Sequence, residues 1–435
     1  MKRLWTILLA CALLATPAVL FASGQSESAS GGQTTIEVYY PVAVDAPIAK
    51  ILDGYIQEFE QANPNIAVKP VYSGGYADVK TAVQTTIQGG GTPPALAVML
   101  ATDLYDLVNA DYILPMDSFL DKLPNKDTYL KDFFPAFLEN SRYNGKLWSI
   151  PFQRSAVVLY YNRDLLAQNN IAVPDSWNSL GKAAAALTER SGNKVTRWGL
   201  EWPSDWPYWL FQPLAIGAGH NIVGDDPTKV YFDDPSVIDA IKYYNSLSGT
   251  YKATPPGVQA TWGAVPNNFS SGNTAMIVHS TGSLTGILSQ AKFNVGVMAI
   301  PGKKTGTYAS VPGGGNLYML KGVPEIQQQA AFKFIQFLTE PARAADFSIQ
   351  TGYIAARKSS YDTDVMKSYI QKVPQAASAR DALQYAGKEL AVQNLGEVRT
   401  VFHKYLQAAF NREMSAGEAM AQAQKEADKA LEPFR

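Results

Sequence analysis

Three strand-then-helix units follow the first 35 residues of the chain, and this alternation limits the fold more than any other feature. Each unit pairs a short β-rich run with a segment of helical periodicity, namely 36–41 with 48–64, 66–72 with 77–90, and 95–100 with 102–110. Short strands that alternate with helices predict a parallel sheet covered by helices. We therefore expect an α/β fold.

The chain has 435 residues, more than one ordinary core holds, so we expect two lobes of about 150 to 200 residues each. Composition shifts near residue 150 to long helical stretches, and the strand–helix alternation returns in 273–302. We predict a first lobe from 36–150 and 272–320 and a second from 151–271 and 321–435. A ligand of such a protein usually lies in the cleft between its lobes.

The N-terminus has the pattern of a secretory signal peptide. Lys2 and Arg3 precede an apolar stretch that ends at the small residues Ala22 and Ser23. We predict a signal peptide over 1–22, a flexible Ser/Gly-rich leader over 23–35, and a periplasmic location. The apolar stretch continues past the only cysteine, Cys11, which argues against a lipid anchor there. The sequence has no later apolar run long enough to span a bilayer.

Charge and residue types exclude several functions. Without residues 1–22 the chain has 35 basic and 38 acidic residues, a formal charge of −3, which argues against nucleic acid as a partner. It then has no cysteine, so it has neither disulfides nor thiolate metal sites. The three histidines stand in unrelated contexts, without the spacing of a zinc site or a catalytic triad. We expect no metal and no cofactor.

Four of the eight tryptophans gather in RWGLEWPSDWPYWLF, residues 197–211. Such a cluster forms packed core, a membrane-interface belt, or a stacking wall for a ligand. The belt is excluded because no membrane-spanning segment accompanies it. Trp198 suits a core position, whereas Trp202 stays undecided between core and ligand wall.

Three loops and one arginine have features of ligand contacts. VYSGGYAD places glycines and Tyr76 between a strand and a helix, and HSTGSL places Ser280 at a helix start, an arrangement that receives anions. SVPGGGNLYML has three glycines that we interpret as a turn before a strand, one that also permits contacts from backbone amides. Arg399 borders an apolar helical stripe, and beside a cleft its guanidinium could hold a phosphate or carboxylate.

Taken together, several stretches resemble one family in order and spacing: NPNIAVKPVYSGGY, GGGTPPALAVM, VVLYYNRDLL, SGNTAMIVHSTGSL and FIQFLTEPARAADFSIQTGY. They resemble the family 1 extracellular solute-binding proteins of bacterial ABC importers, most of all members that bind sn-glycerol-3-phosphate. The resemblance implies two α/β lobes joined by hinge strands, a type II-like periplasmic binding protein fold. It also implies closure over a small solute and docking on a membrane permease. We expect a monomer without enzymatic activity.

The same resemblance implies a set of ligand-binding residues. The phosphate would be held by the hydroxyls of Tyr76, Ser155, Ser280 and Tyr353, the amide of Gly314 and the guanidinium of Arg399. Trp206 and Trp209 match a W-x-x-W motif that walls the glycerol portion. Several donors and one cation from both lobes suit a dianion, which is otherwise costly to desolvate.

One departure from the family pattern concerns the glycerol hydroxyls. Ala101 stands where the glycerol-3-phosphate binders have a glutamate, so selection of that triol is weakened unless Asp103 substitutes. The gap also leaves room for a larger head group, such as a glycerophosphodiester.

Two other functions stay open at this point. A sugar or oligosaccharide receptor of the same fold would use aromatic walls equally well. A secreted carbohydrate-active enzyme would need Glu201 and Asp205 as its carboxylate pair, although their closeness in sequence does not set the separation that such chemistry requires.

Overall fold

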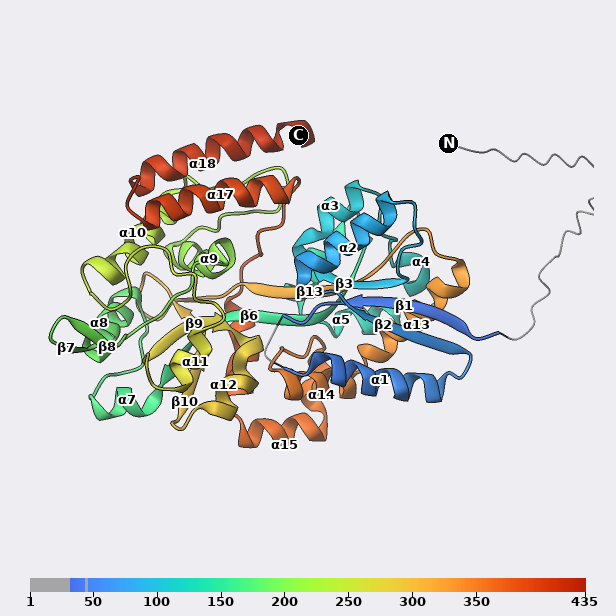
Figure 1. Cartoon of the computed structure of the whole chain (residues 1–435), viewed down its shortest axis with the longest axis horizontal. Helices are drawn as coiled ribbons and strands as arrows, with labels where there is room; N and C mark the ends of the chain where they lie inside the picture. Colours follow the sequence, from blue (N-terminus) through green and yellow to red (C-terminus); the bar gives the residue numbers. More distant parts are fainter. Residues whose placement is uncertain (1–31, 44–45) are drawn as a thin grey trace, which may run out of the picture.

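A computed structural model describes residues 32–43 and 46–435 of the chain. Figure 1 shows two lobes side by side, with long strands running from one into the other. The predicted signal peptide, most of the predicted leader and Cys11 lie outside the described residues. The α/β fold with two lobes is confirmed.

The first lobe is built on the predicted parallel strands. Strand β1 (Thr34–Tyr40) pairs in parallel with β2 (Ile66–Tyr72) on one side and β3 (Leu96–Leu100) on the other. The helices α1 (Ile48–Ala62), α2 (Tyr76–Gln88) and α3 (Leu104–Asn109) follow these strands. Helix α1 buries Ile48, Ile51, Leu52, Tyr55, Ile56 and Phe59, the i, i+3, i+4 spacing of an amphipathic helix.

Short elements complete the first lobe. They are η1 (Ala101–Asp103), α4 (Asp117–Leu120), α5 (Lys126–Lys131), α6 (Pro135–Leu138), η2 (Glu139–Ser141), β4 (Arg142–Tyr143) and β5 (Lys146–Leu147).

Two strands join the lobes. Strand β6 (Ile150–Asn162) is buried along its whole length, and its first half pairs antiparallel with β13 (Pro312–Met319), which in turn pairs with β3. The second half of β6 pairs with β9 (Met276–Ser280) and β10 (Val295–Met298). Ile150 and Phe152 belong to the first core and Val157 and Leu159 to the second, so β6 passes between lobes near Ala156.

The second lobe is mostly helical around β9, β10 and the end of β6. Its helices are α7 (Arg163–Gln168), α8 (Trp177–Leu187), α9 (Pro207–Ala218), α10 (Pro235–Gly249), α11 (Val265–Ser270), α12 (Leu284–Gln290), α17 (Leu395–Phe410) and α18 (Ala416–Leu431). Its remaining short elements are β7 (Glu189–Ser191), β8 (Lys194–Arg197), η3 (Thr281–Ser283), β11 (Ile300–Pro301), β12 (Tyr308–Ala309) and η6 (Glu432–Phe434).

The predicted division between lobes needs correction at two places. Helices α13 (Glu325–Leu338) and α14 (Pro341–Thr351) fall in the predicted second lobe, yet they bury Phe334 and Phe347 in the first core. Strands β9 and β10 fall in the predicted first lobe, yet they pair with the half of β6 that lies in the second. The segment from β9 through α12 to β10 repeats the strand–helix alternation of the first lobe, so the alternation alone does not reveal which sheet a returning strand joins.

The chain passes between lobes a third time after α14. It continues through η4 (Lys358–Asp362), α15 (Asp364–Lys372), α16 (Gln375–Asp381) and η5 (Ala382–Tyr385). Gln375 of α16 already bonds to the Val295 carbonyl of β10, whereas Leu383 packs in the first core and Leu390 in the second, so residues 375–390 form the third connection.

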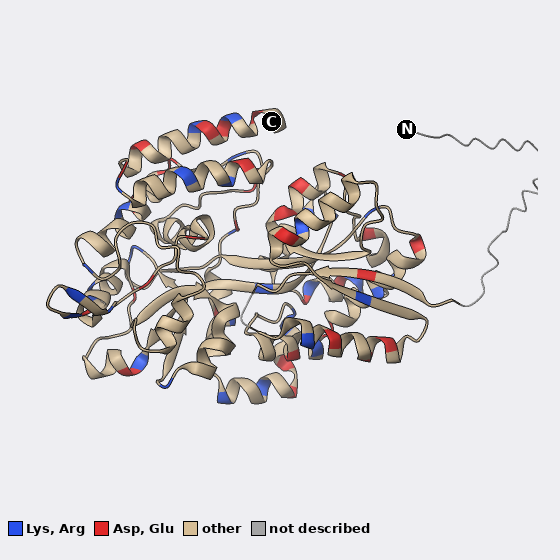
Figure 2. Ribbon diagram, viewed as in Figure 1, with Lys and Arg blue, Asp and Glu red and all other residues tan. Residues whose placement is uncertain are grey.

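Charged side chains lie mainly on the helices. Figure 2 shows Lys and Arg positions interspersed with Asp and Glu positions along the ribbon of both lobes. Strands β6 and β13 together carry one charged residue, Arg154, which is fully buried.

Candidate functional site

A cavity lies where the two lobes meet, at the carboxyl ends of the three parallel strands. Ala43 follows β1, Tyr76 follows β2, and Leu100 ends β3, and all three line it. This is the edge at which α/β sheets ordinarily bind ligands. The remaining lining residues are Ser155, Trp206, Tyr208, Trp209, Trp262, Ser280, Gly314, Tyr353 and Glu389. Seven of the eight predicted ligand-binding residues are therefore brought together around one space, and Arg399 is the eighth.

Two tyrosines form the first-lobe side of the cavity. The Tyr76 hydroxyl donates to Gln153 Oε1 over 3.0 Å and lies 3.2 Å from the Tyr353 hydroxyl. Since the single proton of Tyr76 goes to Gln153, Tyr353 is the donor between the two tyrosines. Burial raises the pKa of Tyr353 to about 12, so it stays a neutral donor near pH 7. An anion in the cavity can accept the hydrogen bond from the Tyr353 hydroxyl in place of Tyr76.

Two serines line the cavity, one from a connecting strand and one from a strand of the second lobe. Ser155 lies in β6 opposite Gly313 of β13. Ser280 ends β9 and caps η3, where its side-chain oxygen accepts from the Gly282 amide over 3.0 Å. The prediction that Ser280 stands at a helix start is confirmed.

The three glycines of SVPGGGNLYML lie inside β13, so their interpretation as a turn before the strand is wrong. A side chain at Gly313 would come within 2.4 Å of the Trp209 ring, and one at Gly315 within 2.6 Å of the Tyr76 ring. At Gly314 it would meet the Gln153 carbonyl oxygen at 1.9 Å, and this residue has φ +93°. The absence of side chains lets two aromatic rings of the cavity lie directly on the strand.

We expect Gly314→Ala to lower the free energy of unfolding by about 2 to 3 kcal/mol, because left-handed backbone strain adds to a clash with the main chain. Gly306→Ala is the matched control, since Gly306 has φ +74° but open space around its Cα. The control should lose only the strain, about 1 kcal/mol. Urea unfolding of both variants measures the difference, and equal losses would show that the close contact with Gln153 is unimportant.

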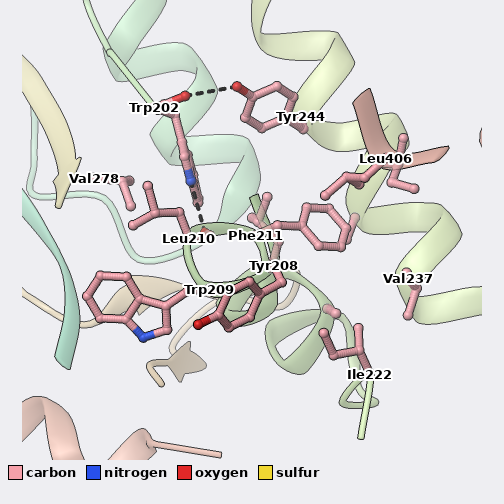
Figure 3. Close-up of a cluster of buried hydrophobic side chains, with 14 of the residues drawn as sticks. Trp202, Tyr208, Trp209, Leu210, Phe211, Ile222, Val237, Tyr244, Val278 and Leu406 are labelled. Carbon is pink, nitrogen blue, oxygen red and sulfur yellow. Dashed lines mark hydrogen bonds between the residues drawn. The ribbon is translucent and has the colours of Figure 1, made fainter. Parts of the chain in front are cut away.

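Aromatic side chains of the second lobe form the opposite wall. Trp206 and Trp209 both line the cavity, and the Trp209 indole N–H donates to the Pro312 carbonyl over 2.9 Å. Trp262 completes the wall, with its ring centroid 6.3 Å from that of Trp206 and 5.9 Å from that of Trp209. Tyr208 lies next to Trp209 at the start of α9 (Figure 3).

Sequence reasoning missed Trp262, which stands alone in the loop before α11. His279 of β9 holds it, with ring centroids 3.8 Å apart and the His279 Nε2 3.1 Å from the Trp262 carbonyl oxygen. Burial lowers the pKa of His279 to about 4, so this histidine is a neutral platform at pH 7. The only signal in the sequence is an isolated tryptophan in a loop, and this does not indicate that its ring lines the cavity.

The two carboxylates of the enzyme alternative have structural partners. Glu201 is buried and accepts from Asn268 Nδ2 over 3.1 Å, and Asp205 accepts from the Trp262 backbone N–H over 3.0 Å. Neither residue lines the cavity. Within residues 32–43 and 46–435 no group of three or more His, Cys, Asp or Glu side chains is placed to hold a metal ion.

The undecided tryptophan, Trp202, belongs to the core of the second lobe. It is 2% exposed, and its indole N–H donates to the Leu210 carbonyl over 3.0 Å. Figure 3 shows its ring between Leu210 and Tyr244, away from Trp209. Trp202 is therefore a packing residue and does not line the cavity.

Arg399 lies behind the aromatic wall. Its guanidinium carbon is 4.5 Å from the centroid of the Tyr208 ring, and the side chain is half-buried. In the described part of the chain it has no hydrogen bond to a protein atom and no carboxylate within ion-pair distance. Its positive charge lowers the pKa of both Tyr208 and Glu389, two residues that line the cavity. Arg399 does not itself line the cavity, so α17 places a cation without a carboxylate partner next to the cavity, on the Tyr208 ring.

Ala101, the residue at the predicted departure from the family pattern, does not line the cavity. It is fully buried, and its carbonyl oxygen is 3.3 Å from the Tyr318 hydroxyl. Asp103 does not line the cavity, because its carboxylate pairs with Lys80 Nζ over 2.9 Å. Glu389, in the third connection, is the one carboxyl group among the lining residues, and sequence reasoning missed it.

Two α/β lobes that enclose a polar and aromatic cavity between three connections define a solute-binding protein. The chain belongs to the bacterial extracellular solute-binding protein family, which residues 54–375 match. This family comprises substrate-binding proteins of ABC transporters. No helix in the described part of the chain is long and apolar enough to cross a membrane.

The individual relatives have low sequence identity to this chain. The sn-glycerol-3-phosphate-binding periplasmic protein UgpB of Escherichia coli K12 is 25% identical, with 92% of this chain and 93% of that protein covered. UgpB of Salmonella typhimurium has the same identity and coverage. Among solved structures, UgpB of Mycobacterium tuberculosis in complex with glycerophosphocholine matches with a TM-score of 0.81 at 23% identity, covering 93% of this chain and all of that one. Maltose-bound MalE3 of T. maritima matches with a TM-score of 0.78 at 21% identity, covering 92% and 100%.

Proposed function

We propose that this protein captures sn-glycerol-3-phosphate or a glycerophosphodiester in the interlobe cavity and delivers it to a membrane permease. It does so without catalysis. Arg399 carries this proposal, because its guanidinium has no hydrogen-bond or ion-pair partner in the described chain and its charge acts on Glu389 of the cavity. A half-buried cation without an ion-pair partner favours a ligand that supplies the negative charge.

The donors around the cavity support a phosphate. Tyr76 and Tyr353 come from the first lobe, Ser155 from the connecting strand β6, and Ser280 from β9 of the second lobe. Phosphate oxygens accept several hydrogen bonds at once, so neutral donors from several directions together with one cation satisfy a phosphate dianion. The names of the UgpB relatives, and the glycerophosphocholine bound to one of them, agree with this choice.

Aromatic surfaces support the glycerol part of the ligand. Trp206, Trp209 and Trp262 offer indole faces, on which the C–H side of a triol packs while its hydroxyls turn to polar groups. A quaternary ammonium head group of a phosphodiester would be attracted by the same faces through cation–π contact.

Ligand capture requires the lobes to move. The cavity has a volume of ≈ 60 Å³, and its lining comes from both lobes. A ligand enclosed between both lobes enters when they open and is held when they close on it. Binding then shifts the population toward a ligand-filled closed form that the permease recognises.

The cellular setting belongs to the same proposal. The pattern of residues 1–22 supports export through a signal peptide, and the relatives named as periplasmic proteins agree with a periplasmic location. We expect a monomer that meets the permease as its partner.

The aromatic wall favours a second candidate, a sugar or oligosaccharide receptor. Three tryptophans and a tyrosine on one side of a cavity are the usual surface for a sugar ring, and the maltose-bound MalE3 has the same fold. The alanine at position 101 also removes the family glutamate expected to select glycerol.

Calorimetric titration with sn-glycerol-3-phosphate, glycerophosphocholine and maltose separates the two candidates. We expect heat from one or both phosphate compounds and none from maltose. Heat from maltose alone would replace the proposed function with that of a sugar receptor.

A further inference from the structure

Glu389 is a buried carboxyl group in the ligand cavity without a protein partner. It lies in the third connection between lobes and is 2% exposed. Its Oε2 atom is buried and makes no hydrogen bond to any described residue. Buried carboxyl oxygens nearly always have a partner, so one that lies in a cavity wall without any is placed to meet a ligand.

The surroundings of Glu389 oppose its ionisation. Burial raises its pKa to about 8, although the positive charges of Arg154 and Arg399 act in the other direction. Arg154 is itself fully buried, and its Nη1 donates to the Gly314 carbonyl over 3.1 Å. Its Nε and Nη2 atoms have no partner in the described chain, so no ion pair with Glu389 forms.

The other charged or titratable groups near Glu389 do not favour its ionised form. Asp103 raises the pKa of Glu389 further, and Lys388, its neighbour in sequence, directs its ammonium to Glu139 at 3.5 Å. The groups that stay neutral near pH 7 because of burial are Tyr208, Tyr318, Tyr76 and His403.

The ligand chemistry decides which form of Glu389 binds. An ionised carboxylate beside a phosphate would place two like charges in a cavity closed to water, which is strongly unfavourable. The protonated acid instead donates its O–H to a phosphate oxygen, and its carbonyl oxygen still accepts from a ligand hydroxyl. A carboxyl group from the third connection would then take over the contact with the ligand that Ala101 cannot make.

We propose that Glu389 is a specificity-determining residue that contacts the ligand as the neutral carboxylic acid, so that capture of an anionic ligand takes up a proton. This inference rests on the proposed function and adds to it a preference for anionic ligands. Below pH 8 most Glu389 side chains are already protonated, and an anion binds directly. Above pH 8 most are ionised, and Glu389 must take up a proton when the anion binds.

The test is calorimetry with glycerophosphocholine and with sn-glycerol-3-phosphate at pH 8.5, where neither ligand titrates. Titrations in Tris and in HEPES, which differ in ionisation enthalpy, give the number of protons taken up. With a pKa of about 8 for Glu389, we expect uptake of roughly three-quarters of a proton per ligand. Between pH 7 and pH 9.5 the affinity should fall about 30-fold.

Glu389→Gln keeps a neutral donor of similar shape and should abolish both the proton uptake and the fall in affinity. Glu201→Gln is the matched control, because Glu201 is also buried but lies outside the cavity, and it should retain both. Binding of a phosphate compound by the wild type without proton uptake overturns the role of Glu389 alone. Absence of binding by both phosphate compounds overturns the proposed function and the role of Glu389 with it.

Discussion

Arg399→Ala should weaken binding of the phosphate ligand by about 2 to 5 kcal/mol, the loss expected when one partner of a buried charge pair is removed. In the wild type the Arg399 guanidinium rests on Tyr208 and has no carboxylate within ion-pair distance in the described chain, so a bound anion would be its direct partner. Without it, the dianion is desolvated with neutral donors alone. Calorimetry or competition with a fluorescent ligand measures the loss.

Two variants sharpen this prediction. Arg399→Lys keeps the charge but loses the planar guanidinium that stacks on Tyr208, so an intermediate loss is expected. Arg190→Ala removes a guanidinium that lies 5.7 Å from the Trp198 ring at the surface of the second lobe, and it should leave affinity unchanged. If Arg399→Ala binds the phosphate compounds as tightly as Arg190→Ala does, the anion does not bind near α17.

The tryptophan cluster gives the second large effect. Trp202→Ala should lower the free energy of unfolding by about 3 to 5 kcal/mol, because a fully buried indole is deleted from the core of the second lobe and the Leu210 carbonyl loses its donor. Trp206→Ala should cost far less stability, since Trp206 is only partly buried, but it should weaken ligand binding.

Urea unfolding and calorimetry on both variants separate the two roles. The expected outcome is one variant with a stability defect and another with a binding defect. A binding defect in a still-folded Trp202→Ala, together with normal binding by Trp206→Ala, would reverse the assignment of wall and core.

Much of the first lobe was predictable because its strands and helices alternate in the simplest way. The predicted strand over 66–72 has the observed limits of β2, and the helix predicted over 48–64 is α1, which ends at Ala62. Membership of a lobe was not predictable for α13 and α14. Their amphipathic faces show that they are buried but not on which sheet, since that depends on where β13 returns.

Seven of the eight predicted ligand-binding residues line one cavity, but the prediction left out other residues that line it. Residues next to strand ends, such as Tyr76 and Ser280, carry a local signal because glycines or a helix start accompany them. Trp262 and Glu389 have no local sequence signal that places them at the cavity, since only contacts between residues distant in sequence bring them there. The glycines of β13 were misinterpreted because close packing of Trp209 and Tyr76 on a strand leaves the same sequence signal as a turn.

A crystal structure of the protein grown with sn-glycerol-3-phosphate tests the central claim most directly. We expect the lobes closed around the ligand, with its phosphate bonded to the Arg399 guanidinium and to the hydroxyls of Ser155, Ser280 and Tyr353. The glycerol portion should lie against Trp206 and Trp209. An empty cavity at saturating ligand, or a phosphate bound away from Arg399, would contradict the account.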